Sequence, residues 1–403
     1  MNNKDIIMFA LPRWDGPFFS TALSLAKELS RANRVFYVDN PFTLKDMLAG
    51  LFTKPIRIRL VAFVFGFNQY RSIDKDNSNL INVTPHPTLP INFLPPGKVY
   101  DFFSSINNAI VRRSISSVIR DYRIKDFIYI NSFNPFYFLG VDAFGPLCKI
   151  YHCVDNIAAS KYYTAKHGRL LEKKMIQNFD LTLTTSQRLS EYARRLSKHV
   201  FYLPNAADFK LFQRARETAI ARPREIKDVD KKIIGYIGSV DYRIDYDLLI
   251  EIATQFPEHV LLLVGPTGSN FERSGLEKFS NVISTGSKHL TELPSYVRFM
   301  DCGIIPFLCN TLTESIYPLK LNEYLAAAKP VVTTNFSPDL NEFEDVIRIA
   351  STKKEFVASL SDELRTDSEE KQLSRIKKAA GNTWEARVQE FWRIVEPYCR
   401  QAS

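Results

Sequence analysis

The sequence has few of the residues that define several common classes of protein. Its 403 residues include only five cysteines: Cys148, Cys153, Cys302, Cys309 and Cys399. They are too few and too irregularly spaced for a disulfide framework, and only one close pair occurs, so free thiols in a reducing compartment are expected. No cluster of His, Cys and Asp residues has the spacing of a metal site, so no bound metal is expected.

Long hydrophobic runs are also missing. The chain begins MNNKDIIMFALP, without a basic stretch followed by a long apolar run, so we expect no signal peptide. The most apolar later run, residues 60–67, is far shorter than the roughly 20 residues that a spanning helix needs. These absences predict a cytoplasmic protein.

The glycine signatures of common nucleotide sites are absent. The turn after the first expected strand reads LPRWDGP, which is not G-x-G-x-x-G, and no P-loop or G-x-S-x-G elbow occurs. Asp39 ends the second strand, as in dehydrogenases, but without the glycines it is weak evidence. The D-x-D triplets at 228–230 and 245–247 are expected by chance among 44 acidic residues. Nicotinamide chemistry and NTP hydrolysis are therefore disfavoured.

Charge is distributed unevenly along the chain, whose net charge is +9. Residues 1–205 carry 27 Lys and Arg against 15 Asp and Glu, whereas the remainder carries 26 against 29. A basic first half suits an anionic partner, namely a nucleic acid, an anionic membrane surface or a phosphorylated substrate. A solvated basic surface without a partner is the alternative.

Short apolar runs alternate with helical patterns, which is typical of parallel sheets covered on both faces. Strands are predicted at 6–11, 35–38, 80–83, 127–130, 149–152, 181–184, 200–203, 233–237, 260–264, 282–284, 303–306, 331–333 and 346–349. The clearest helices are predicted at 18–30, 99–122, 169–178, 186–196, 247–255, 292–300 and 319–328.

This pattern predicts an α/β protein with two Rossmann-like domains. The first is expected over 1–208 and the second over 233–370, with a charged linker at 209–232. Residues 371–403 are expected to form a closing helix that packs back toward the first domain.

The most specific stretch is YPLKLNEYLAAAKPVV, residues 317–332. Pro318 opens a helix on which Lys320 and Glu323 share one side. Beside a sheet crevice, a lysine suits a diphosphate and a glutamate suits a ribose diol. An ordinary surface ion pair is an equally good interpretation of these two residues alone.

This stretch resembles the donor-binding segment of the group 1 retaining glycosyltransferases, P-x-K-x-x-E-[YA]-x-A-x-G-x-P-V-V. The sequences GYIGSVDYR (235–243), LPNAAD (203–208), LVGP (263–266) and TG (285–286) resemble other family segments in order and spacing. RWDG (13–16) and YHCVD (151–155) resemble a bacterial subgroup that builds exopolysaccharide and teichuronic-type envelope polymers. Three features depart from the family: Ser315 replaces a second glutamate, Ala328 replaces a glycine, and the glycine-rich loop after the first strand is reduced to Gly16.

The resemblance implies a GT-B fold, with parallel sheets facing across a cleft, and a metal-independent, cofactor-free hexosyl- or related glycosyltransferase. The donor would be a nucleotide sugar, and the acceptor a glycan or a lipid-linked glycan used in cell-surface polysaccharide synthesis. The implied donor-binding residues are Gly16, Gly238, Arg243, Gly265, Gly286, Lys320, Leu321 and Glu323. The implied catalytic residues are His152 and Asp155, and Arg13, Trp14 and Asp15 are implied on the acceptor side.

Each implied role has a structural alternative. Arg243 could simply pair with Asp241 or Asp245. His152 could be a hydrogen-bonded core histidine, and Asp155 an N-cap.

Two other function classes stay open. A GT-B sugar-nucleotide epimerase would hydrolyse the same donor bond. A non-catalytic nucleotide- or nucleic-acid-binding protein is suggested only by the basic first half, which lacks an RNA-binding pattern, so no nucleic-acid partner is expected.

The sequence also suggests peripheral docking on the inner face of the plasma membrane. Apolar residues within 56–67 and 89–103 lie near Arg57, Arg59, Arg112 and Arg113. The alternative is that 58–65 is a buried strand and the charges are merely solvating.

Overall fold

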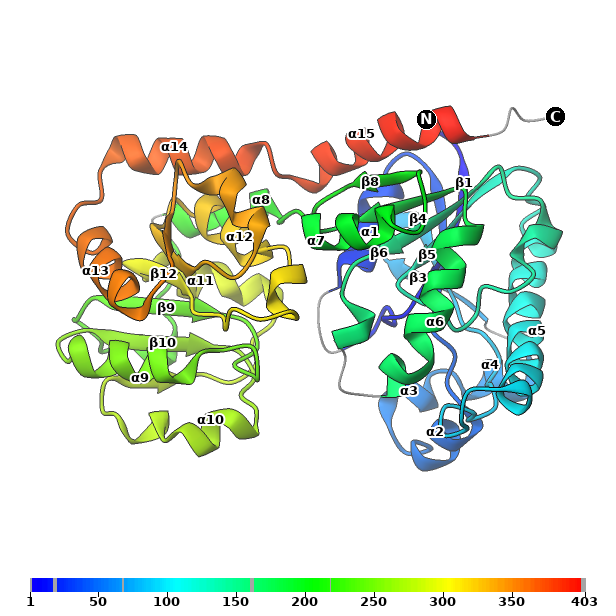
Figure 1. The fold of residues 1–403 in the computed structure, drawn as a ribbon, viewed down its shortest axis with the longest axis horizontal. Helices are drawn as coiled ribbons and strands as arrows, with labels where there is room; N and C mark the ends of the chain where they lie inside the picture. Colours follow the sequence, from blue (N-terminus) through cyan, green and yellow to red (C-terminus); the bar gives the residue numbers. More distant parts are fainter. Residues whose placement is uncertain (1, 17–19, 67–68, 160–162, 218, 400–403) are drawn as a thin grey trace. The chain divides into compact units, whose positions relative to one another are not determined.

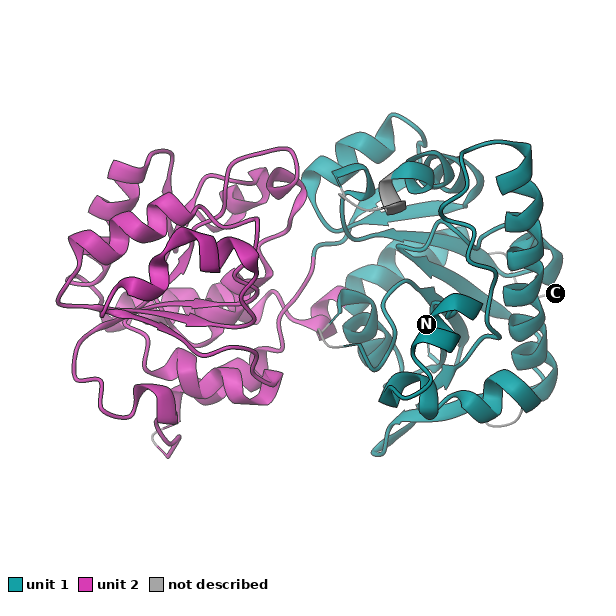
Figure 2. Cartoon of the chain, turned by 90° about the horizontal axis from the view of Figure 1, so that it is seen from below, with its two compact units in different colours: residues 1–204, 388–403 teal, residues 205–387 magenta. Residues whose placement is uncertain are grey.

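The structure is a computed structural model, which describes residues 2–16, 20–66, 69–159, 163–217 and 219–399. The chain forms two compact units (Figure 2). Unit 1 comprises Met1–Pro204 and Val388–Ser403, and unit 2 comprises Asn205–Arg387.

Unit 1 is built on an eight-stranded sheet in the order β3-β4-β2-β1-β5-β6-β7-β8 (Figure 1). Neighbouring strands run parallel except for the antiparallel β3–β4 pair. The strands are β1 (Asp5–Ala10), β2 (Arg34–Val38), β3 (Tyr70–Asp74), β4 (Asn77–Val83), β5 (Phe127–Ser132), β6 (Cys148–Cys153), β7 (Leu181–Thr184) and β8 (Val200–Tyr202). The apolar strands β1, β2, β5, β6 and β7 are almost wholly buried, as expected for parallel strands covered on both faces.

The helices of unit 1 join these strands. They are α1 (Thr21–Leu29), α2 (Leu44–Ala49), α3 (Lys54–Arg57), α4 (Leu60–Phe65), α5 (Lys98–Asp121), α6 (Tyr163–Asn178) and α7 (Gln187–Arg194). Ser20 caps α1 and Ser186 caps α7, each accepting a hydrogen bond from the backbone N–H three residues later. Residues 58–65, for which a buried strand was the alternative to a docking surface, form α4 and its preceding turn instead.

Unit 2 is built on a six-stranded sheet in the order β11-β10-β9-β12-β13-β14, in which every paired strand is parallel. The strands are β9 (Ile233–Ile237), β10 (Val260–Val264), β11 (Val282–Ser284), β12 (Cys302–Ile305), β13 (Val331–Thr334) and β14 (Arg348–Ala350). Its helices are α8 (Phe209–Gln213), α9 (Tyr246–Gln255), α10 (Ser269–Ser274), α11 (Leu293–Arg298), α12 (Leu319–Ala326), α13 (Lys353–Glu363) and α14 (Glu369–Ala380). The predicted α/β class with two Rossmann-like sheets is confirmed.

The segment 209–232 is not a linker. It contains α8, and Phe212, Ala215 and Ile226 are buried in the core of unit 2. The prediction was wrong because the many charges of this segment surround a few widely spaced apolar residues that anchor it. The unit boundary lies at 204–205 instead.

The C-terminal segment is two helices rather than one. The chain turns at Gly381–Thr383 between α14 and α15 (Trp384–Val395). Residues up to Arg387 belong to unit 2, and residues from Val388 rejoin unit 1, where Phe391 and Val395 are buried. The return to unit 1 agrees with the expected closing segment, but α14 belongs to unit 2, where it packs against α12.

Each sheet has a point at which the strand order reverses. In unit 1 this point lies between β1 and β5, and in unit 2 between β9 and β12. Open α/β sheets bind ligands at the carboxyl ends of the strands beside such a reversal. Ligands are therefore expected to bind at the loops after β1, β5, β6, β9, β10 and β12.

Candidate functional site

The carboxyl ends of β9, β10 and β11 in unit 2 are joined through three glycines. The Gly238 N–H donates to the Val264 carbonyl at 2.8 Å, and Gly265 forms a backbone bridge with Gly286. Gly238 and Gly265 have φ angles of 126° and 149°. A Cβ on Gly265 would lie 2.1 Å from the Gly238 oxygen, so only glycine permits this approach. The three predicted glycines are thus brought together at one sheet edge.

Lys320 lies directly beside this glycine-closed edge. It follows Pro318 and Leu319 at the start of α12, and a Cβ on Gly238 would lie 2.2 Å from the Lys320 Cε. The lysine side chain therefore occupies the space that a side chain at position 238 would fill. Its ammonium lies 5.6 Å from the ring centre of Tyr236 and 5.5 Å from that of Phe307, both within cation–π range.

Lys320 and Glu323 are half-buried charges without protein partners. Neither side chain makes a hydrogen bond or an ion pair with any residue that the structure describes. Burial lowers the pKa of Lys320 to about 8, and the nearby Arg243 charge lowers it further, whereas Glu323 opposes the change. Burial raises the pKa of Glu323 to about 7, which Lys320 partly offsets. The ion pair that was the alternative interpretation is therefore not formed, and both groups remain available to a ligand.

Arg243 is already engaged within the protein. Its guanidinium donates to Asp241 at 2.9 and 2.7 Å and lies 5.8 Å from the Phe307 ring centre. This is the pairing with Asp241 that the sequence left open. Asp245 instead caps α9, accepting from the Leu248 N–H at 3.0 Å. A diphosphate role for Arg243 stays a prediction.

Leu321 differs from Lys320 and Glu323, the other predicted donor-binding residues of α12, because its side chain is fully buried in the core of unit 2. It has no exposed side-chain surface to offer a ligand, and its N–H already donates to the Pro318 carbonyl at 3.0 Å. Its role is to hold α12 on the sheet.

In unit 1, Arg13, Trp14, Asp15 and Gly16 form the loop after β1. Arg13 lies over the Phe42 ring, with 3.5 Å between the guanidinium carbon and the ring centre, and donates to the Asn40 carbonyl at 2.9 Å. The Gly16 N–H donates to the Arg13 carbonyl at 3.0 Å, which closes a turn. These four residues lie together at the carboxyl edge of the unit 1 sheet.

A buried ion-pair group fixes this loop. Arg59 is 3% exposed and donates to Asp15 at 2.7 Å and to Asp39 at 2.9 Å, and Asp39 also accepts from the Trp14 N–H at 3.0 Å. The sequence suggested Arg59 as a contact for lipid headgroups, which is wrong because its guanidinium is buried between two carboxylates. Asp39 thus anchors the loop, a role that its position after β2 did not reveal.

His152 is the penultimate residue of β6 and is 2% exposed. Its Nδ1 lies 3.1 Å from the Ser132 Oγ, and burial lowers its pKa to about 4, so the ring is neutral near pH 7. Asp155 is exposed and accepts from the Asn156 N–H at 2.9 Å. The Asn156 side chain, not that of Asp155, accepts from the N–H groups of Ala158 and Ala159 in the following turn.

Tyr236 and Phe307 were missed by the sequence interpretation. Each lies at or just beyond the end of a central strand, and both rings contact the space around Lys320. Their position at strand ends was the available signal. Among the described residues, no group of three or more His, Cys, Asp or Glu side chains could hold a metal ion, and no helix is long and apolar enough to cross a membrane.

The sequence of unit 2 matches a known family. Residues 231–365 match the family described as "Glycosyl transferases group 1". The chain is also 32% identical over 203 residues to "Putative teichuronic acid biosynthesis glycosyltransferase TuaH" of Bacillus subtilis (strain 168), a match that covers 46% of this chain and 50% of the relative. The chain thus matches about half the length of this curated relative.

Solved structures resemble nearly the whole chain. Sucrose-phosphate synthase from Thermosynechococcus elongatus has a TM-score of 0.69 at 14% identity, covering 98% of this chain and 99% of that one. A trehalose-6-phosphate structure from E. coli, bound with UDP-2-fluoro glucose, has a TM-score of 0.67 at 13% identity, with the same coverage. At these identities the likeness shows the fold alone, which is GT-B.

Proposed function

Because residues 231–365 form a group 1 glycosyltransferase domain and the chain has the GT-B fold, we propose that the protein transfers a sugar from a nucleotide-diphosphate donor to a glycan acceptor. The proposed donor site is the carboxyl edge of the unit 2 sheet. A hexosyl or related sugar is transferred, and the product belongs to a bacterial cell-surface polysaccharide, in keeping with the name of the B. subtilis relative.

The unpaired charges of Lys320 and Glu323 carry this proposal. A buried charge without a partner costs free energy. Two such charges beside the glycine-closed sheet edge are explained if a bound ligand supplies their partners. An ammonium group suits a diphosphate, and a carboxylate can accept two hydrogen bonds from a ribose diol. The spacing of the two residues along α12 suits a nucleoside diphosphate lying along one side of this helix.

The proposed reaction retains the anomeric configuration and needs no metal ion. As the bond between the sugar and the diphosphate breaks, negative charge grows on the leaving diphosphate. Lys320 supplies a fixed positive charge there, and Arg243, held in place by Asp241, supplies a second. The departing phosphate then takes the acceptor proton, so the site needs no strong protein base.

Unit 1 is proposed to receive the acceptor. Neutral His152, hydrogen-bonded to Ser132, can exchange hydrogen bonds with sugar hydroxyls, and exposed Asp155 lies in the loop that follows its strand. Arg13 and Trp14 belong to a loop held rigid by the buried Arg59 ion pairs, so they suit the positioning of an acceptor rather than proton transfer.

A panel of UDP-, GDP- and dTDP-sugars tests this proposal. We expect one donor class to release its nucleoside diphosphate, with the sugar appearing in covalent linkage to an added acceptor. A free 2-epimer of the donor sugar would favour an epimerase, and salt-dependent RNA binding without donor turnover would favour a non-catalytic protein. Either result contradicts the proposal.

We further propose that the acceptor is lipid-linked and that unit 1 docks reversibly on the cytoplasmic membrane face. Residues 44–65 expose Leu48, Phe52, Val64 and Phe65 by 66%, 95%, 64% and 69%. Exposed cations in the same segment are Lys45, Lys54 and Arg57. Exposed apolar groups among cations suit the interface of an anionic bilayer, where each cation contributes about 1 kcal/mol.

Vesicle co-sedimentation tests the docking. The protein should bind vesicles that contain anionic lipid, less so at high salt, and Phe52→Ser combined with Phe65→Ser should weaken binding while donor turnover in solution stays intact. Leu373→Ser, which changes an exposed apolar residue of unit 2, is the matched control. A protein that stays in the supernatant at low salt contradicts the docking and leaves the donor site unaffected.

A further inference from the structure

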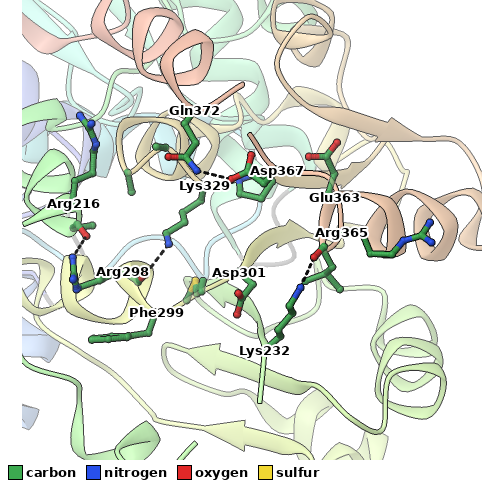
Figure 3. A pocket seen from close by; sticks show the side chains of 16 residues that line it. Arg216, Lys232, Arg298, Phe299, Asp301, Lys329, Glu363, Arg365, Asp367 and Gln372 are labelled. Atoms are coloured by element: carbon green, nitrogen blue, oxygen red, sulfur yellow. Dashed lines mark hydrogen bonds between the residues drawn. The ribbon is translucent and has the colours of Figure 1, made fainter. Parts of the chain in front are cut away.

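Unit 2 contains a pocket, whose lining residues are drawn in Figure 3, at the amino ends of its strands and so at the edge opposite the glycine-closed edge. The pocket has a volume of about 720 Å³. Lys232 lies just before β9, Asp301 just before β12, and Lys329 just before β13, so the amino ends of three strands line it. Its size is within the range of small-molecule sites.

Cationic side chains dominate this pocket. Arg216, Lys232, Arg298 and Lys329 line it, and none has a carboxylate partner within ion-pair distance among the residues that the structure describes. Arg216 is exposed and makes no side-chain hydrogen bond there either. Four unneutralised cations around one cavity favour an anionic ligand.

The other charged residues of the pocket are already paired. Glu363 lies 3.3 Å from Arg375, and Asp367 lies 2.7 Å from the same guanidinium. Arg365 pairs with Asp362 at 2.6 Å. Asp301 is then the one lining carboxylate without a cation partner among the described residues, so the cations remain in excess.

Helix capping explains only part of this arrangement. The Lys329 ammonium donates to the Arg298 carbonyl at 2.7 Å, and the Lys232 ammonium donates to the Leu364 carbonyl at 2.6 Å, at the ends of α11 and α13. Each contact uses one of three ammonium donors, so further donors stay available. Burial lowers the pKa of Lys329 to about 8; the nearby carboxylates of Asp301 and Asp367 oppose this change, and the charges of Arg298 and Arg375 add to it.

We propose that this pocket binds a phosphate-bearing small molecule, a phosphate monoester or a diphosphate, at a site separate from the donor site. Phosphate groups suit the pocket because arginine forks and lysine ammonium groups can each donate to several phosphate oxygens. Phe299 in the wall adds an aromatic ring for the uncharged part of the ligand, whereas the Gln372 amide already donates to Asp367 at 2.9 Å. The shared chemistry allows a sugar phosphate or a nucleotide as the source.

The test uses calorimetric titration of the full chain with inorganic pyrophosphate, a hexose 1-phosphate and UDP. Arg216→Gln combined with Lys232→Gln should weaken pyrophosphate binding by about tenfold or more, because both side chains are exposed cations of the pocket. Lys231→Gln is the matched control, since this neighbouring exposed lysine does not line the pocket. Lys320→Ala should leave a pyrophosphate site intact. Thermal unfolding checks that each variant is folded.

The comparison among ligands identifies the source of the phosphate. If the Lys320→Ala protein binds hexose 1-phosphate more tightly than UDP, the ligand is a sugar phosphate. If it binds UDP more tightly, the ligand is a nucleotide. The proposal is overturned if pyrophosphate does not bind, or if its binding is lost in Lys320→Ala and unchanged in the pocket double variant. Wild-type UDP affinity in Lys320→Ala, with pyrophosphate binding weakened only in the pocket double variant, would instead count against the donor site alone.

Discussion

Replacing Lys320 by methionine should separate stability from donor binding. Methionine keeps most of the apolar length that packs beside Gly238, Tyr236 and Phe307 but removes the charge. In the free protein this charge is half-buried and has no protein partner among the described residues. The same substitution therefore removes the free-energy cost of an unpaired charge from the free protein and removes the contact with the diphosphate from the donor complex.

The magnitudes follow from these two states. Burying an unsatisfied polar or charged group costs about 1–3 kcal/mol, so Lys320→Met should raise the free energy of unfolding by up to that amount. Loss of a charge-assisted contact of about 1.5–3 kcal/mol should weaken nucleoside diphosphate binding by roughly 10- to 150-fold. Because burial lowers the pKa of Lys320, the stability of the wild type should rise as pH increases from about 8 toward the usual lysine value, and the variant should lack this rise.

The assay pairs urea unfolding with calorimetric titration of UDP, GDP and dTDP. Lys278→Met is the matched control, because Lys278 is exposed and lies elsewhere in unit 2, and it should change neither quantity. A folded Lys320→Met protein with wild-type nucleotide affinity would refute the site assignment. A variant clearly less stable than the wild type would refute the inference that the lysine charge is uncompensated.

Four further outcomes are expected. Gly265→Ala should lower the free energy of unfolding by more than Gly275→Ala. The Cβ added at position 265 would lie 2.1 Å from the Gly238 oxygen, whereas the Cβ added at position 275 would lie 3.9 Å from the Lys278 side chain. Equal losses in the two variants would contradict this. Ala328→Gly should raise the free energy of unfolding by about 0.5–1 kcal/mol, because Ala328 has a φ of 63°, and urea titration would show it. Because burial lowers the pKa of His152, the wild type should lose up to about 1.4 kcal/mol of stability per pH unit as pH falls from 6.5 toward 4. The His152→Phe protein should lack this loss. Sugar transfer should persist in EDTA, and a complete loss that Mn²⁺ or Mg²⁺ restores would contradict the proposed mechanism.

The strands were predictable from the sequence because most are short apolar runs between polar loops. The strand β3 was missed because its residues, YRSID, are largely polar and pair only at the sheet edge. The break between α14 and α15 was missed because the helical pattern continues across Gly381. In each case tertiary pairing, not local periodicity, decides the structure.

Lys320 and Glu323 could be found from the sequence because Pro318, Lys320 and Glu323 lie within six consecutive residues. The ion pairs of Arg59 with Asp15 and Asp39 could not, because the partners lie 44 and 20 residues away and meet only when the sheet forms. The pairing of Arg243 with Asp241 was foreseen only as an alternative, since local spacing allows it without requiring it.

The position of the bound donor is the central claim, and hydrogen exchange with mass spectrometry tests it directly. A saturating nucleoside diphosphate of the class that turns over should protect the amides of 235–243, 263–267 and 317–326, which lie at the carboxyl edge of the unit 2 sheet. The same ligand should leave these segments unprotected in the Lys320→Met protein. Protection confined to unit 1, or protection that Lys320→Met does not reduce, would contradict the donor site.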